Sequence, residues 1–66
     1  MTGFGKNLRE ARMRIGRTQG WMAKRLNIDR TTYTKYETEN VEPDFETLYY
    51  IGQLVGVPVD DLIKPD

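Results

Sequence analysis

The sequence predicts an all-α fold, a compact domain of five helices, and three observations lead to this fold class. Apolar residues recur at steps of three and four, which is typical of one face of a helix. No segment alternates between apolar and polar residues over the length of a strand. The 66 residues, of which 38% are hydrophobic, suffice for one domain over residues 1–66 but not for two.

The first helix is predicted from a single apolar stripe with steps of four, three and four residues, formed by Phe4, Leu8, Ala11 and Ile15. We expect all four side chains in the core. Gly16 follows the stripe and is expected to end the helix, because glycine readily adopts the left-handed conformation that terminates helices.

Two short helices joined by a tight turn are predicted next, in a unit of about residues 18–37. Thr18 is expected to cap a helix over residues 19–26, whose inward side chains are Met22, Ala23 and Leu26. The turn is residues 27–29, in which Ile28 is expected to be buried. Asp29 is expected to cap a helix from residue 30 to about residue 38.

The C-terminal part is predicted to hold a loop and two further helices. The polar residues 38–43 form the loop, and Asp44 caps a fourth helix. The core residues expected from that helix are Phe45, Leu48, Ile51 and Val55. Gly56 ends it, and residues 60–63 form a fifth helical turn.

Composition excludes several classes of function. The chain has no cysteine and no histidine, which removes disulfides, thiolate metal sites and the commonest general base. We therefore expect no enzyme, no metal and no cofactor. No apolar run approaches the about 20 residues that cross a bilayer, and the first residues do not resemble a signal peptide, so a cytoplasmic protein is expected.

The charges are segregated along the chain although the net charge is zero. Residues 1–35 hold nine basic and two acidic residues, a net charge of +7, whereas residues 36–66 hold one basic and eight acidic residues, a net charge of −7. Such asymmetry favours one basic and one acidic face, and a basic face is typical of phosphate binding. Ordinary solvated helix surfaces are the alternative interpretation.

The unit of residues 18–37 has the pattern of a helix-turn-helix, although any corner between two helices could produce it. With Tyr33, Tyr36 and Glu37 facing inward, the outward side chains of its second helix can all contact DNA, with Thr32 at the margin. The predicted base-reading residues are Arg30, Thr31, Thr34 and Lys35.

The sequence resembles the Cro and phage-repressor (XRE-type) family of helix-turn-helix transcriptional regulators over nearly its whole length, from Phe4 to Ile63. The residues that carry the resemblance are Thr18-Gln19, Met22-Ala23, the run from Leu26 to Glu37, and Pro43 with Thr47-Leu48. This resemblance implies a lambda-repressor-like fold that binds a palindromic operator as a dimer. It places the helix that starts at Arg30 in the major groove.

The resemblance also implies further residue roles. Gln19 is expected on a DNA phosphate, within a phosphate-binding set of Arg17, Thr18, Gln19, Thr32 and Asn40. Arg12 and Glu37 are expected to form a structural ion pair. From the residues themselves, and not from the resemblance, Tyr50, Leu54, Pro58 and Val59 are expected to form an exposed apolar surface, which is either the contact of a homodimer or ordinary surface.

Two departures from the family pattern affect the expected binding. The loop after the second helix of the unit carries Glu39 and Glu42, which oppose phosphate contacts and leave Asn40 as its donor. Trp21 lies outside the core stripe of its helix. Its ring is expected either to cover the stem of Arg17 or Arg25, or to serve as a contact anchor.

Two functions are consistent with these observations. The first is a sequence-specific DNA-binding regulator, and because only three residues follow the fifth helix we expect a stand-alone repressor or control protein. The alternative is a protein-interaction module that keeps the fold but docks a protein through Trp21, Tyr50 and the acidic half. The face from Arg30 to Lys35 favours DNA, whereas the zero net charge favours the alternative.

Overall fold

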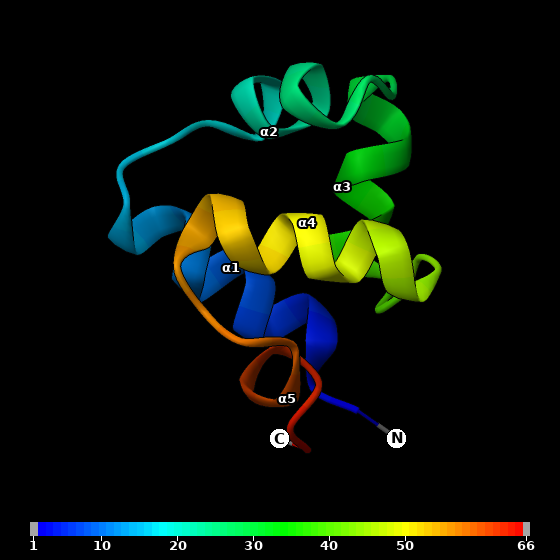
Figure 1. Cartoon of the computed structure of the whole chain (residues 1–66). Coiled ribbons are helices and arrows are strands. Elements are labelled where there is room, and N and C mark those ends of the chain that lie inside the picture. The colour runs from blue at the N-terminus through cyan, green and yellow to red at the C-terminus, as the bar shows by residue number, and fades with distance from the viewer. Residues whose placement is uncertain (1, 66) are drawn as a thin grey trace.

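A computed structural model describes residues 2–65, which form five α-helices and no strand (Figure 1). Met1 and Asp66, the two ends of the predicted domain, lie outside the described residues. The helices are α1 (Phe4–Arg14), α2 (Gln19–Leu26), α3 (Arg30–Thr38), α4 (Phe45–Val55) and α5 (Val59–Leu62). The predicted all-α class with five helices is confirmed. The predicted fifth turn begins one residue earlier than expected, at Val59.

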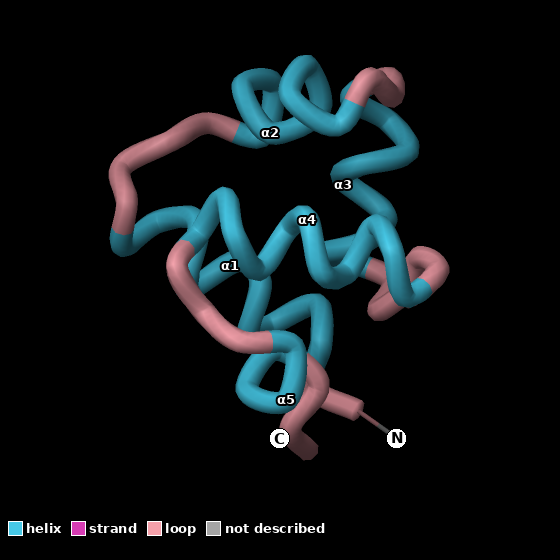
Figure 2. The backbone as a smooth tube through the Cα atoms, viewed as in Figure 1, coloured by secondary structure: helices cyan, strands magenta, loops and turns pink. Residues whose placement is uncertain are grey.

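In the view of Figure 1, α4 overlaps α1 in the middle of the molecule, with α2 and the start of α3 at one end and α5 at the other. The described ends of the chain both lie beside α5, where the Gly3 amide donates to the Lys64 carbonyl at 2.8 Å. The segment between α1 and α2 is an extended loop along the outside (Figure 2). The predicted helix-turn-helix unit therefore occupies the end of the domain opposite to α5.

Local side chains fix the helix starts that the sequence predicts. The Thr18 hydroxyl accepts from the Trp21 amide at 3.0 Å, and the Asp44 carboxylate accepts from the Thr47 amide at 2.9 Å. The hydrogen bonds from Thr47 hold the pKa of Asp44 below its ordinary value. Gly16 and Gly56, with φ of 70° and 73°, end their helices in the left-handed conformation.

The core lies where all five helices meet. Its buried apolar residues are Phe4, Leu8, Ala11, Met22, Ala23, Tyr33, Tyr36, Leu48, Ile51, Val55 and Leu62. Two core predictions were wrong, because Ile15 is 37% exposed and Phe45 is 69% exposed. Ile15 lies one residue beyond the end of α1, and Phe45 is the first residue of α4, so each lies at a helix end. Ile28 is half-buried against the core instead of fully buried.

Close backbone approach joins α1 to the end of α3. A Cβ atom on Gly5 would lie 2.5 Å from the carbonyl oxygen of Glu37, so only glycine fits there. The side chain of Asn40 strengthens this junction, because its Oδ1 accepts from the Gly5 amide at 2.8 Å and its Nδ2 donates to the Thr2 carbonyl at 2.7 Å. Nearby, the Thr2 hydroxyl donates to the Glu42 carboxylate.

Candidate nucleic-acid interface

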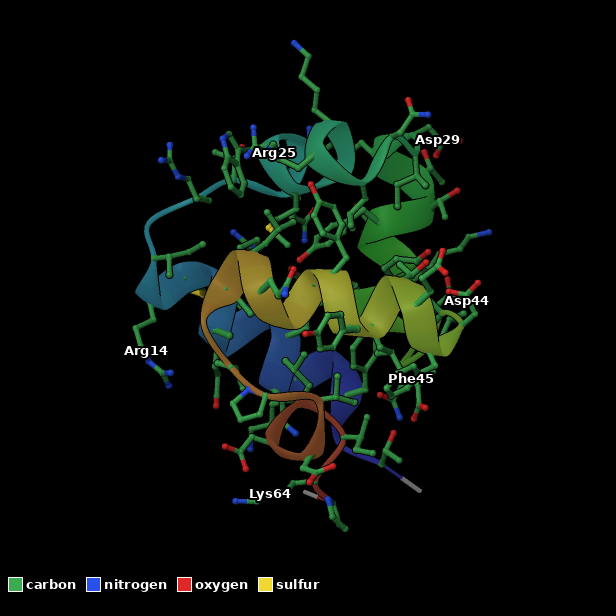
Figure 3. All side chains as sticks on the ribbon, in the orientation of Figure 1. Arg14, Arg25, Asp29, Asp44, Phe45 and Lys64 are labelled. Carbon is green, nitrogen blue, oxygen red and sulfur yellow. The ribbon has the colours of Figure 1, made fainter. Side chains whose placement is uncertain are left out.

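The position of α3 is set by the turn that precedes it. Asn27 adopts the left-handed conformation, with φ of 57°, and reverses the chain after α2. The Asp29 carboxylate then accepts from the Thr32 amide at 2.8 Å, which caps α3. This hydrogen bond from the Thr32 backbone is the main reason why the pKa of Asp29 lies below its ordinary value. Figure 3 shows Asp29 at the outer edge of the molecule, where α3 begins.

The helix α3 has one buried and one outward face. Tyr33, Tyr36 and Glu37 are buried, as the sequence predicts. On the outward face, the predicted base-reading residues meet Gln19 of α2 around one shallow hollow of about 390 Å³. The hollow is lined by Gln19, Arg30, Thr31, Thr34, Lys35, Thr38 and Glu39. Arginine, lysine and threonine are side chains that can bind base edges, and five of the seven residues that line the hollow are of these types.

A buried ion pair between Arg12 and Glu37 is connected to this hollow through Gln19. Arg12 Nε is 2.7 Å from Glu37 Oε2, and Arg12 Nη2 donates to Glu37 Oε1 at 3.2 Å. The Glu37 side chain has no exposed surface and the Arg12 side chain is 12% exposed. Arg12 Nη1 also donates to the Arg17 carbonyl at 2.7 Å. One guanidinium therefore joins α1, the end of α3 and the segment before α2.

The Glu37 carboxylate accepts two further hydrogen bonds. The Tyr33 hydroxyl donates at 2.5 Å and Gln19 Nε2 donates at 3.0 Å. Burial raises the pKa of Glu37, but the bonds from Arg12, Tyr33 and Gln19 outweigh it and hold the pKa below its ordinary value. Burial, together with the bond to Glu37, raises the pKa of Tyr33. Glu37 is therefore ionised at neutral pH, and both of its carboxylate oxygens accept hydrogen bonds.

Gln19 connects this buried network to the surface. Its Nε2 donates to Glu37, and its Oε1 accepts from the Thr34 hydroxyl at 2.9 Å. Gln19 and Thr34 are both half-buried. The sequence predicts roles for Gln19 and Thr34 separately, but it reveals neither their contact nor the part that Tyr33 takes in the network. The spacing of four residues between Tyr33 and Glu37 on one helix is the signal that could have indicated that part.

The remaining predicted phosphate-binding residues occupy different environments. Arg17, Thr18 and Thr32 are exposed near the ends of α2 and α3. Asn40 lies apart from them, since both polar groups of its side chain bind the N-terminal segment. Glu39, the residue that follows α3, also borders the hollow.

Trp21 is half-buried on α2 and packs against the core. The guanidinium carbon of Arg17 lies 4.6 Å from the centre of its ring and that of Arg25 lies 5.2 Å away. Both distances are typical of cation–π contacts. The ring therefore contacts both arginines that the sequence offers as alternatives, of which Figure 3 labels Arg25 on α2.

The four predicted dimer residues do not share one hollow. Pro58 and Val59 line a hollow of about 380 Å³ together with Phe45 and Tyr49, whose rings stack at 6.4 Å. Tyr50, which is 41% exposed, and the half-buried Leu54 do not line it. Figure 3 shows Phe45 beside Asp44, at the end of α4 remote from α2.

A metal-binding cluster and a membrane-spanning helix are both absent from residues 2–65. In that part of the chain no group of histidine, cysteine, aspartate or glutamate side chains could hold a metal ion. None of the five helices has the length and apolar character needed to cross a membrane.

Comparisons with known proteins agree with the geometry. Residues 5–64 match a family described as helix-turn-helix domain. Three proteins of Bacillus subtilis (strain 168) are similar to the chain. The uncharacterized HTH-type transcriptional regulator YqaE is 41% identical over 61 residues, which cover 92% of this chain and 53% of that protein.

The other two relatives match to a similar extent. The SPbeta prophage-derived uncharacterized HTH-type transcriptional regulator YonR is 41% identical over 61 residues, 92% of this chain and 56% of that protein. The HTH-type transcriptional regulator ImmR is 39% identical over 63 residues, 96% of this chain and 50% of that protein. The chain thus spans about half the length of the curated relatives that it matches.

Proposed function

Since the chain belongs to the family of helix-turn-helix domains, we propose that it regulates transcription by binding duplex DNA in a sequence-specific manner. The proposed regulator is a repressor or control protein that acts in the cytoplasm. The names of three relatives, all HTH-type transcriptional regulators, support the regulatory role.

The outward face of α3 carries this proposal. Arg30, Thr31 and Lys35 are exposed, Thr34 is half-buried, and all four border the same hollow. An α-helix fits the major groove, where arginine and lysine donate to guanine and threonine can contact bases or methyl groups. The buried Glu37 on the opposite side of α3 fixes this face with respect to α1 and α2. We assign base reading to these four side chains.

Phosphate contacts are assigned to the edges of the same surface. Gln19 keeps one N–H of its amide after donating to Glu37, and the Thr18 hydroxyl keeps its hydrogen while accepting from the Trp21 amide. Arg17 and Thr32 are exposed beside them. Asn40 is left out of this proposed set because its side chain binds Thr2 and Gly5.

We propose further that the protein binds a palindromic operator as a homodimer. Two copies related by a two-fold axis can present their α3 helices roughly 34 Å apart, which matches half-sites one turn of DNA apart. The proposed contact centres on Pro58 and Val59, where Phe45 and Tyr49 add apolar surface, and extends toward Tyr50 and Leu54. Val59→Asp should yield a folded monomer with weakened operator binding, and Tyr50→Asp should weaken it less. Equal affinities of Val59→Asp and the unchanged protein would contradict this interface.

A selection of random duplex DNA at low salt tests the proposed function. We expect enrichment of a palindromic site, and a log–log salt slope of about −4 to −6, because the acidic loop removes phosphate contacts. Arg30→Ala should lower affinity by about 1 to 3 kcal/mol and relax preference at one base pair of each half-site. Arg14→Ala is the control, because Arg14 is an exposed arginine of α1 and does not line the hollow (Figure 3). Enrichment of no sequence would overturn the proposal.

A protein-docking function is the second candidate, and one observation favours it. Phe45 and Tyr49 are 69% and 55% exposed and stack beside an apolar hollow. Exposed apolar surface of this kind is common at protein interfaces. Trp21, one of the anchors expected from the sequence, instead contacts Arg17 and Arg25. Failure of the DNA selection would leave this candidate as the proposed function.

A further inference from the structure

We propose that Thr34 reads DNA only as a hydrogen-bond acceptor, and that it therefore selects a base that presents an amino group in the major groove. The bases of this class are adenine, through N6, and cytosine, through N4. This inference rests on the proposed function, because it assigns one determinant of specificity within that binding surface. It follows from the direction of two hydrogen bonds, which lead from the buried Glu37 through Gln19 to Thr34 at the surface.

The first step is the chemistry of Glu37. An ionised carboxylate has no hydrogen to donate and can only accept. Glu37 is held in that form by Arg12, whose Nε lies 2.7 Å from Oε2. Every group that contacts the carboxylate must therefore present a hydrogen to it.

The second step fixes the orientation of the Gln19 amide. The Gln19 atom that lies 3.0 Å from Glu37 Oε1 has to be the nitrogen, Nε2. A reversed amide would place the carbonyl oxygen against the carboxylate oxygen, where two acceptors repel and neither supplies a hydrogen. The carbonyl oxygen, Oε1, is consequently directed to the other side, toward Thr34.

The third step fixes the hydroxyl of Thr34. Its Oγ1 lies 2.9 Å from Gln19 Oε1, which is an acceptor, so the single hydroxyl hydrogen belongs to this bond. Only lone pairs remain on Oγ1 for a partner outside the protein. Because Thr34 lines the hollow beside Arg30 and Lys35, those lone pairs are available to DNA on the proposed base-reading face.

These constraints produce a definite base preference. The lone pairs of Thr34 can accept from an adenine or cytosine amino group, but they repel guanine O6 and thymine O4. If the hydroxyl turned to donate to one of those oxygens, the half-buried Gln19 carbonyl would lose its partner. The preference thus depends on Gln19, a residue that contacts no base in this proposal.

The experiment compares base preference among variants of the intact chain. The base pair contacted by Thr34 is located as the position at which Thr34→Val alters the selected sequence. Four duplexes that differ only at that position are then compared. We expect the unchanged protein to prefer adenine or cytosine on the contacted strand by about three- to tenfold, the worth of one hydrogen bond, and Thr34→Ser to retain the preference.

Removing the acceptor on Gln19 should free the hydroxyl hydrogen of Thr34, which could then donate to DNA. Gln19→Ala should lower affinity for all four duplexes and reduce the preference to less than about twofold, because the hydroxyl can then donate or accept. Gln19→Lys tests the same step with a folded network, since it keeps a donor for Glu37 but offers Thr34 no acceptor. Lys24→Ala is the control, because Lys24 is exposed on α2, does not line the hollow and belongs to none of the proposed binding sets. It should leave the preference unchanged.

The outcomes separate this inference from the proposed function. A selected site with a preference for guanine or thymine at this position would overturn the role of Thr34 alone. So would a preference that persists in both Gln19 variants, or a Thr34→Val variant that alters no position. Selection of no sequence by the unchanged protein would overturn the proposed function and this inference together.

Discussion

The packing beneath α3 and the packing beneath α4 differ in chemistry. Under α3, charged and polar groups of Arg12, Tyr33 and Glu37 meet in a buried network in which each hydrogen bond has a fixed donor and acceptor. Under α4, Ile51 and Val55 make apolar contacts with the rest of the core. The described residues include no buried polar side-chain atom without a partner, so every buried polar atom of the network beneath α3 has a hydrogen-bond partner.

This difference shows that the domain meets two requirements, stability and a fixed direction of contacting groups, in two separate regions. Apolar contacts stabilise in proportion to buried area and impose little direction on the groups that meet. A buried charge network imposes direction, because a rotated group would lose its partner in a medium of low dielectric constant. The proposed DNA surface lies above the network, and the apolar region stabilises the fold. The predictions below test this division in order of expected effect.

The largest effect is expected from breaking the ion pair. Arg12→Met leaves the fully buried Glu37 carboxylate without its cation and should lower the free energy of unfolding by about 3 to 5 kcal/mol. That loss approaches the whole stability of a small domain. Urea denaturation of Arg12→Met beside Arg14→Met, an exposed arginine of the same helix, measures it. A melting temperature within a degree or two of that of the unchanged protein would show that the pair is not structurally important.

A cavity in the apolar region is expected to have a similar or smaller effect on stability. Ile51 is fully buried, and Ile51→Ala should cost about 2 to 5 kcal/mol of unfolding free energy. In contrast to the change at Arg12, it leaves the network beneath α3 intact. Measured at a temperature where the variant is folded, its base preference should therefore equal that of the unchanged protein. An altered preference would contradict the division between the two regions.

Acid should weaken the two regions unequally. The pKa of Glu37 is lowered in the folded protein, so its contribution is fully present above the unfolded value of about 4.3 and is lost as pH falls through the folded pKa. Melting temperatures should consequently drop below about pH 4. Glu37→Gln should be less stable at pH 7 and should show a flatter decline in acid, although Asp29 and Asp44 retain their own dependence. Parallel profiles of the two proteins would contradict this assignment.

The smallest effect is expected at Phe45. Because its ring is 69% exposed, Phe45→Ala should change the free energy of unfolding by only about 0.5 kcal/mol. A buried phenylalanine, as expected from the sequence, would cost about 3 to 5 kcal/mol. Thermal melts of Phe45→Ala and Ile51→Ala provide the comparison. A loss of several kcal/mol at Phe45 would place its ring in the core after all.

The sequence predicted the helices best where the determining contacts are local. Thr18, Asp29 and Asp44 each bind a backbone amide three residues ahead, so their roles depend only on neighbouring positions. Apolar spacing failed at the helix ends. The apolar spacing extends the stripe of α1 to Ile15 and that of α4 to Phe45. Spacing alone does not show where the neighbouring helices, which would cover these side chains, come to an end.

The candidate site was predictable as a set of residues but not as a network. Helical geometry separates the outward Arg30 and Lys35 from the inward Glu37, so the surface could be named. The bond between Gln19 and Thr34 joins positions fifteen residues apart on two helices, and only their packing determines it. The contacts of Asn40 were not predicted for the same reason, because its partners Thr2 and Gly5 lie far from it in the sequence, near the N-terminus.

The bond between Asn40 and Gly5 has a consequence for the order of folding. No side chain at Gly3 caps α1, so a capping oxygen for its first turn comes from a residue 35 positions later. During synthesis from the N-terminus, α1 is made first but can complete this turn only after α3 and the following loop have docked. The beginning of α1 should therefore be among the last segments to acquire protection from hydrogen exchange during refolding.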